Sequence, residues 1–214
     1  YGPKGIKEII TLQLKLAKSW TDYPLHFHEL EQDSSQVVFE DETVRVETLP
    51  LDHRIYTNGF LFTTQASKRK MNVDAIKDFD LLPFHFKQLQ QGADVTLEDG
   101  RILENEVYTL PPSKSKKYAY CSDTAYFEPL VPGIKEVDLL YHEATFLEKN
   151  SDLAANTKHS TAKQAAQIAK MANVKQLMLG HFSNRYPNKE DFITEASDTF
   201  QNVILAEDLK TFNI

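Results

Sequence analysis

Cysteine is almost absent from this sequence of 214 residues, because Cys121 is the only one. A single cysteine forms no disulfide within the chain and offers no paired thiolates for a zinc site. We therefore expect a reducing, cytoplasmic compartment.

A net positive charge and a long apolar run are also missing. The formal net charge is -7, so the chain does not attract nucleic acid through its overall charge, and such a role requires a locally basic element. No stretch of about 18 apolar residues is present, and no basic-then-apolar leader opens the chain. These absences predict a soluble, unsecreted protein without a spanning helix.

The residues that are present suit one globular domain. Hydrophobic residues make up 41% and aromatic residues 11% of the chain, which suffices for a domain of this size to bury roughly 70% of its extended surface. Tyr1 opens the sequence where Met would be usual, and an apolar helical pattern follows at once. We therefore expect that the beginning of the chain is missing and that part of any active site lies outside it.

Strand-like runs and helical runs follow one another along the chain. Helical spacing predicts an amphipathic helix from Pro3 to Trp20, and Thr161 with Gln164 forms a capping box for a helix that ends at Asn173. The predicted strands are residues 25–30, 36–39, 43–49, 59–64, 118–121, 137–141 and 176–179. This order predicts a layered α/β (α+β) arrangement rather than a helical bundle or an all-β sandwich.

Residues 64–118 differ in charge from the rest of the chain. They hold nine basic and eight acidic side chains, a net charge of +1, which leaves -8 for the remainder. A hairpin signal covers residues 95–103, with its turn at Glu98-Asp99-Gly100. We interpret the segment as an insertion or projecting arm, and a solvated loop without a function is the alternative.

Polar residues that could carry chemistry follow several strand-like runs. His53, Asp123, His142 and His181 each stand just past such a run, and His159 precedes the helix capped by Thr161. Polar groups at strand ends build the sites of α/β sheets, and imidazole nitrogen with carboxylate oxygen suits hydrolytic zinc or manganese. Each histidine alone is more often structural, so the combination carries the prediction.

Two other histidine-bearing segments are predicted not to form the site. His26 and His28 share one face of a strand-like run, but no acidic residue or further histidine follows at matching spacing. His85, between Phe84 and Phe86, is predicted to be structural.

Five segments of the sequence form an ordered set of motifs. They are Tyr1-Gly2-Pro3-Lys4-Gly5-Ile6, Asp52-His53-Arg54, Tyr120-Cys121-Ser122-Asp123-Thr124, His142-Glu143-Ala144-Thr145-Phe146 with His159-Ser160-Thr161, and Gly180-His181-Phe182-Ser183-Asn184-Arg185-Tyr186. Together they resemble the ribonuclease Z family, the endonucleases of the metallo-β-lactamase superfamily that trim the 3′ end of precursor tRNA. Their order and spacing cover nearly the whole chain, which makes the resemblance specific.

The resemblance implies the αββα four-layer sandwich of the metallo-β-lactamases, of which this chain would supply the C-terminal portion. Residues 1–64 would form the central part of that domain and residues 118–214 its C-terminal half. Residues 65–117 would form the flexible arm of the family, which grips the tRNA.

The resemblance also implies roles for the candidate residues. His53 would bind one zinc ion, His181 the other, and Asp123 would bridge both, with Mn²⁺ or Mg²⁺ as possible replacements. Such a metal pair lowers the pKa of a bound water and stabilises charge on the attacked phosphate. His142 with Glu143 would be the catalytic pair that protonates the leaving oxygen. An orienting contact to a metal ligand is the alternative for His142.

Substrate contacts are implied at two places. His159 and Arg185 would meet phosphate near the metals, although a structural salt bridge is equally open for Arg185. In the arm, Lys68, Arg69 and Lys70 would contact the phosphates of tRNA.

One family motif is absent from the sequence. The family's principal metal motif, two alternating histidines and then an Asp-His pair, lies upstream of the Gly-Pro-Lys-Gly segment and is not found here. We therefore expect that these residues alone do not hold two zinc ions tightly and that the fragment alone is inactive.

The activity implied for the full-length protein is zinc-dependent hydrolysis of precursor tRNA 3′ of the discriminator nucleotide, which leaves a 3′-OH, by a cytoplasmic homodimer. Two alternatives stay open. One is another phosphodiesterase of the same superfamily, and the other is a non-catalytic module for dimerisation or RNA binding.

Overall fold

The computed structural model describes residues 1–214 and divides them into two compact units. The first unit consists of Tyr1–Thr63 with Lys117–Ile214, and the second of Thr64–Lys116. The second unit begins and ends one residue before the expected arm, and the role of this segment as an arm stays a prediction.

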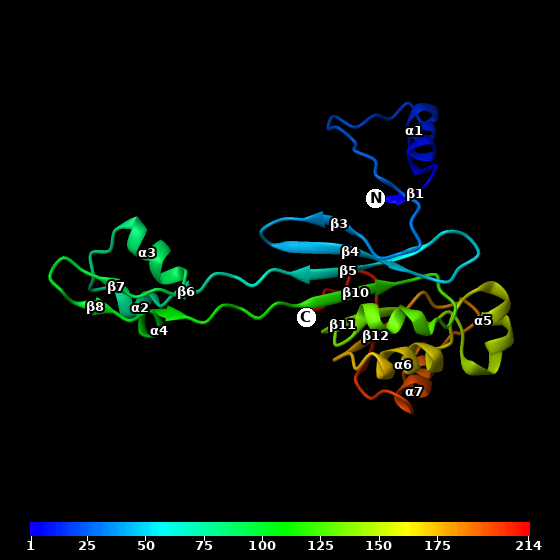
Figure 1. Ribbon diagram of the computed structural model, residues 1–214. Helices are drawn as coiled ribbons and strands as arrows, with labels where there is room; N and C mark the ends of the chain where they lie inside the picture. The colour runs from blue at the N-terminus through cyan, green and yellow to red at the C-terminus, as the bar shows by residue number, and fades with distance from the viewer. The chain divides into compact units, whose positions relative to one another are not determined.

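A seven-stranded sheet forms the centre of the first unit (Figure 1). Its strands, in the order in which they lie across the sheet, are β13 (Val203–Leu205), β12 (Leu177–Gly180), β11 (Leu139–Glu143), β10 (Lys117–Cys121), β5 (Asn58–Thr64), β4 (Val44–Pro50) and β3 (Val37–Glu40). The strands from β10 to β13 are parallel neighbours, whereas β5 is antiparallel to β10 and β3 is antiparallel to β4. The four residues of β12 are all buried, as expected for a strand inside a parallel sheet.

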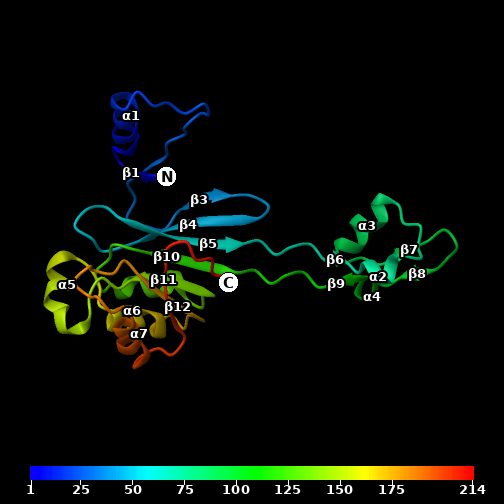
Figure 2. The same cartoon turned by 180° about the vertical axis from the view of Figure 1, so that it is seen from behind.

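Helices lie against the parallel half of this sheet (Figure 2). They are α6 (Ala162–Met171), which contacts β11 and β12, and α7 (Glu190–Ser197), which contacts α6 and β13. The 3₁₀ helix η1 (Glu128–Ile134) contacts α6 and β4, and the 3₁₀ helix η2 (Glu148–Asn150) contacts α6 and α5 (Ser151–Thr157). The core between the two layers contains Leu140, Ile168, Leu177 and Phe192, all fully buried. Burial of each such side chain stabilises the fold by about 1.5–3 kcal/mol.

Small side chains allow α6 to lie close to the sheet. Its alanines at positions 162, 165, 166 and 169 are fully buried. Thr161 Oγ1 accepts a hydrogen bond from Gln164 N at 3.2 Å, and Thr161 N donates to Gln164 Oε1 at 2.9 Å, so the predicted capping box is confirmed. The helix ends at Met171, two residues before the predicted end at Asn173, which adopts a left-handed φ of 51°.

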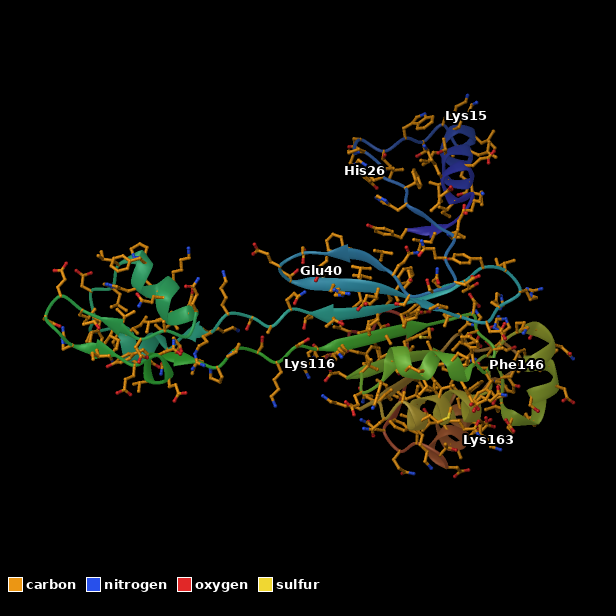
Figure 3. All side chains as sticks on the ribbon, in the orientation of Figure 1. Lys15, His26, Glu40, Lys116, Phe146 and Lys163 are labelled. Carbon is orange, nitrogen blue, oxygen red and sulfur yellow. The ribbon has the colours of Figure 1, made fainter.

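The N-terminal helix is shorter than predicted. Helix α1 (Ile6–Leu16) follows β1 (Gly2–Pro3), which pairs in parallel with β2 (Glu29–Leu30). Of the predicted strand 25–30, only these two residues of β2 form a strand. Lys18 has a left-handed φ of 50°, which ends the helical path before Trp20. No side chain of α1 is buried, and Trp20 is 66% exposed. Figure 3 shows the side chains of this region.

Strand β11 lies two residues further along the chain than predicted. His142 and Glu143 are therefore its last two residues, not residues that follow it. Both side chains are buried. The carboxylate of Glu143 makes its hydrogen bonds inside the protein, as a buried charge requires, whereas His142 makes one, between its Nδ1 and Glu143 O at 2.8 Å.

The second unit has a small core of its own. Its elements are β6 (Lys70–Met71), α2 (Val73–Ile76), α3 (Pro83–Gln90), β7 (Val95–Thr96), β8 (Ile102–Leu103), α4 (Asn105–Tyr108) and β9 (Thr109–Leu110). Leu89, Val95 and Leu103 are its buried centre. The predicted hairpin of β7 and β8 is present, and Gly100 in its turn has a φ of 84°. His85 is buried and its Nδ1 accepts a hydrogen bond from Leu82 N, so its predicted structural role is confirmed.

None of the helices combines the length and the apolar composition that crossing a membrane would require.

Candidate metal and catalytic site

Three parallel strands end at one edge of the sheet and bring three candidate residues there. Strand β10 ends at Cys121, β11 at Glu143 and β12 at Gly180, and Asp123 and His181 follow in the loops. Loops after the carboxyl ends of neighbouring parallel strands meet at the same edge, where α/β sheets bind their ligands. Asp123 Oδ1 lies 3.3 Å from His181 Nε2.

Asp123 and His181 both have a left-handed backbone. Their φ angles are 59° and 58°, a region that residues other than glycine occupy uncommonly. Residues held in sparsely populated backbone regions cluster at functional sites, because the surrounding structure must stabilise them there.

Two further loops carry histidines to the same place. His159 lies between α5 and α6, and His53 follows β4. Ala125 N donates to Asp52 O at 2.8 Å, which ties the His53 loop to the loop after β10. Lys158 links the two histidine loops, since its carbonyl lies 2.9 Å from His53 Nδ1 and its Nζ lies 2.8 Å from Asp52 Oδ2.

The histidine rings of the site stand side by side. Ring centroids are 5.2 Å apart for His53 and His159, and 5.3 Å apart for His159 and His181. A carbonyl can only accept a hydrogen bond, so we assign the proton of His53 to Nδ1, which leaves a lone pair on Nε2 for a metal ion.

The carboxylate of Glu143 is the fixed centre of the site. It is fully buried, and its Oε1 accepts hydrogen bonds from His159 Nδ1 at 2.7 Å and from Thr124 N at 2.8 Å. Its Oε2 accepts from Thr145 Oγ1 at 2.6 Å, Thr145 N at 3.3 Å and Ser160 N at 3.1 Å. Five donors therefore satisfy a charge that burial alone would disfavour.

The same hydrogen bonds set the pKa values of this pair. Burial raises the pKa of Glu143, but the hydrogen bonds from His159, Thr145 and Ser160 outweigh it, so the net pKa lies below the ordinary value. The hydrogen bond to Glu143 raises the pKa of His159 above its ordinary value, against the opposing effect of burial. The pair thus favours an ionised carboxylate next to a readily protonated imidazole.

Thr145 orients His181 through its hydroxyl group. The single proton of Thr145 Oγ1 goes to the ionised Glu143, so the oxygen must accept the proton of His181 Nδ1, 2.8 Å away. This assignment leaves the lone pair of His181 Nε2 directed toward Asp123.

These residues fit a divalent metal ion. The close pair of His181 Nε2 and Asp123 Oδ1 consists of two acceptor atoms, which approach favourably only with a cation or a proton between them. One ligand atom each from Asp123, Glu143, His159 and His181 lies within 4.8 Å of all the others. The nitrogen and oxygen donors match zinc and related ions.

The predicted metal-binding and catalytic residues do not all belong to one cluster. Asp123, Glu143, His159 and His181 form one cluster, and His53 stands next to it beside His159. His142 does not join them, because its ring is only 1% exposed and its Nε2 has no hydrogen-bond partner. Burial also lowers the pKa of His142. The role of His142 in protonating the leaving group stays a prediction, and in this structure its imidazole lies apart from the cluster.

The predicted substrate-binding residues lie in different parts of the chain. The Arg185 guanidinium is exposed and lies 5.3 Å from the centroid of the Phe146 ring, which in turn meets the His159 ring edge-on at 6.3 Å. Arg185 is therefore free of a carboxylate partner and close to the cluster. Lys68, Arg69 and Lys70 belong to the second unit, where the two lysines are exposed and Arg69 is half-buried.

Sequence reasoning assigned no role to Thr145 and Lys158. Thr145 stands in the segment 142–146 that carries the family resemblance, which is the one signal that could have drawn attention to it. Lys158 contacts His53 through its backbone carbonyl and has a left-handed φ of 59°. The residue type alone predicts neither feature.

Comparison with known proteins places the chain in a superfamily and a family. The Beta-lactamase superfamily domain matches residues 107–182. The crystal structure of the short form of human tRNase Z matches with a TM-score of 0.64 at 24% identity, over 100% of this chain and 66% of that chain. The metallo-β-lactamase fold protein YhfI of Bacillus subtilis matches with a TM-score of 0.56 at 15% identity, over 96% and 54%. The predicted metallo-β-lactamase fold is confirmed.

Sequence relatives are closer than these structures. Ribonuclease Z of Cytophaga hutchinsonii is 44% identical over 216 residues, and ribonuclease Z of Phocaeicola vulgatus is 37% identical over 209 residues. The alignments cover 100% and 98% of this chain and 68% of each relative. With identity of this level along its whole length, the chain belongs to the ribonuclease Z family.

Proposed function

We propose that this protein acts as a metal-dependent endoribonuclease that removes the 3′ trailer from precursor tRNA. The observation that carries the proposal is the convergence of Asp123, Glu143, His159 and His181 within 4.8 Å at the sheet edge of a ribonuclease Z relative. We assign this activity to the protein that contains these residues together with the upstream histidine motif of the family.

Asp123, His181 and His53 are the residues that would hold the metal ions. Both histidines have a lone pair on Nε2 because their Nδ1 atoms donate elsewhere, and Asp123 offers an oxygen that two ions can share. When bound, a pair of zinc ions supplies Lewis-acid stabilisation of the phosphate charge and makes water a better nucleophile at neutral pH. Zinc is our first choice for this nitrogen and oxygen donor set, with manganese or magnesium as replacements.

His159 is the residue that we assign to proton transfer, in place of the buried His142. Its Nδ1–H donates to Glu143, so Nε2 is the atom that gains and releases a proton. As the water oxygen bonds to phosphorus and the P–O3′ bond breaks, the proton on Nε2 passes to O3′, and the proton that the water releases restores the protonated form of His159. The tRNA then ends in a 3′-OH and the phosphate remains on the trailer.

Arg185 and the arm would bind the RNA around the reacting phosphate. The planar guanidinium of Arg185 suits two phosphate oxygens, and its contact with the Phe146 ring limits its movement. We further propose that the protein works as a cytoplasmic homodimer.

Cleavage of a precursor tRNA with a labelled trailer tests the function. We expect zinc-dependent release of the trailer, a tRNA that poly(A) polymerase can extend from its 3′-OH, and a loss of at least about a hundredfold in rate for His159→Asn. His26→Asn is the matched control, because His26 lies outside the metal cluster and should leave the rate unchanged (Figure 3). Equal cleavage of a small phosphodiester and of precursor tRNA would instead support another phosphodiesterase of the superfamily.

Zinc binding by the 214-residue chain tests the ligand set separately. We expect fewer than two tightly bound equivalents at micromolar protein, and weaker binding after Asp123→Asn. Two tight equivalents would contradict our inference that further ligands come from the upstream motif.

A further inference from the structure

A hollow of about 550 Å³ is set into the surface of the second unit. Its lining comes from the loop before α3, from the start of α3 and from the hairpin of β7 and β8. None of the lining residues belongs to the candidate metal site or to the RNA contacts that the family resemblance implies. The volume lies within the range of ligand-binding pockets, so the chemistry of the lining decides what the hollow binds.

His85 contributes a hydrogen-bond donor without a partner to this hollow. Its side chain is only 7% exposed, and its Nδ1 accepts a hydrogen bond from Leu82 N at 3.2 Å. The ring is therefore neutral and carries its proton on Nε2. No protein group accepts from this N–H, and Nε2 is not among the sealed atoms without partners, which are Asn58 Oδ1 and His142 Nε2. The donor thus opens onto the hollow that His85 lines, and a bound molecule must offer it an acceptor.

Two carboxylates of the lining have no cation of their own. Asp80 and Glu98 are exposed, and neither forms an ion pair within the protein. Arg101 also lines the hollow, but its Nη2 lies 2.6 Å from Asp99 Oδ2 and is engaged there. Residues 71–110 as a whole hold eight exposed carboxylates and three cations, a net charge of -5. The hollow therefore attracts a cationic molecule and repels phosphate.

An apolar surface adjoins these polar groups. Leu82 and Phe84 line the hollow and are 49% and 59% exposed. The Phe84 ring contacts the His85 ring, with centroids 4.0 Å apart, so apolar surface lies directly beside the free N–H. An exposed apolar surface with polar residues around it marks an interaction site.

We propose that this hollow is a docking site for a segment of a partner protein that bears both basic and apolar side chains. A main-chain carbonyl of the segment accepts the hydrogen bond of His85 Nε2–H. Its lysine or arginine pairs with Asp80 and Glu98, and its apolar side chain packs on Leu82 and Phe84. A peptide offers an acceptor, a cation and an apolar group together. A metal ion or a polyamine offers no acceptor, and the phosphates of RNA meet repulsion. The proposal concerns an interaction beyond the proposed nuclease activity.

Binding of three labelled peptides to the intact protein, measured by fluorescence anisotropy, tests the chemistry of the occupant. The first peptide consists of lysine, leucine and glycine. The second has glutamate in place of lysine, and the third has serine in place of leucine. We expect the first to bind at least about tenfold more tightly than either of the others, because each of those lacks one of the two kinds of contact.

Two matched double variants test the place of binding. Asp80→Asn with Glu98→Gln removes the two unpaired carboxylates of the hollow. Asp74→Asn with Glu106→Gln removes two exposed carboxylates of the same unit that do not line it, so both variants change the net charge equally. We expect the first variant to bind the lysine–leucine peptide about fivefold more weakly, and the second to bind it nearly as the unchanged protein does. Thermal unfolding checks that each variant is folded.

The apolar contact has a matched pair of its own. Phe84→Ala should weaken the lysine–leucine peptide and leave the lysine–serine peptide unchanged, whereas Val107→Ala, at an exposed position outside the hollow, should affect neither. Absence of binding, equal binding of the three peptides, or equal effects of the two charge variants would overturn the proposal. Displacement of the bound peptide by precursor tRNA would assign the hollow to RNA and overturn it as well. All of these results are independent of whether the protein cleaves precursor tRNA.

Discussion

A single hydroxyl group, that of Thr145, connects the carboxylate and the metal-ligand side of the candidate site. Thr145→Val keeps the volume of the side chain and removes both of its hydrogen bonds. The bond to Glu143 contributes about 1.5–3 kcal/mol, because its acceptor is charged and fully buried, where water cannot replace the lost donor. The bond from His181 adds little, because that side chain is 43% exposed and water can accept its proton. We expect the free energy of unfolding of the metal-free protein to fall by about 2–3 kcal/mol.

Urea unfolding and the nitrogen chemical shifts of His181 measure the two effects. Thr145→Ser is the matched control, because it keeps the hydroxyl and should lose only about 0.8 kcal/mol for the buried methyl group. We expect the proton of His181 to stay on Nδ1 in the Ser variant and to distribute between both nitrogens in the Val variant. Equal stability of the two variants, with the same nitrogen shifts, would refute the role assigned to the hydroxyl.

Three further predictions concern the sheet edge and its supports. Gly59→Ala would place a Cβ 2.5 Å from the Tyr120 carbonyl oxygen, so we expect a loss of at least about 2 kcal/mol in urea unfolding, and a neutral variant would contradict the strand contact. Lys158→Gly and Lys158→Ala both remove the ion pair with Asp52, but only Gly relieves the left-handed backbone. The Gly variant should therefore be more stable than the Ala variant by about 1 kcal/mol, and equal unfolding midpoints would count against this account. Burial raises the pKa of the Cys121 thiol, so a thiol reagent should react with the folded protein far more slowly than with protein in urea, and equal rates would show that the thiol is accessible.

Sequence patterns correctly predicted structural features that depend on residues close together in the chain. The capping box of Thr161 and Gln164 concerns residues three apart, and the structure shows it as predicted. The predicted end of the first helix was wrong, because apolar residues continue at helical spacing to Trp20 although the backbone turns left-handed at Lys18. Side-chain spacing reports which residues could share a face, and it does not report where the backbone leaves the helix.

The arrangement of the candidate site was harder to predict from the sequence, because its hydrogen bonds join segments that are distant in the chain. The sequence suggested a pair of His142 and Glu143, whereas the partner of Glu143 is His159, sixteen residues further along the chain. Side chains alternate along β11, so neighbours in sequence point to opposite faces. The roles given to the metal-binding and substrate-binding residues stay predictions, and the structure contributes their distances and hydrogen bonds.

The alternation of side chains between the two faces of β11 also favours the correct register of this strand in the sheet. His142 and Leu140 lie on the same face of β11, and Leu140 belongs to the helix-covered core. Glu143 lies on the opposite face, where its carboxylate accepts the five hydrogen bonds described above. A slip of this strand by one residue would exchange the two faces and push an ionised carboxylate into the apolar layer without partners. Such a misaligned chain would be several kcal/mol less stable. Glu143, the centre of the candidate site, thereby also disfavours misaligned forms of the sheet.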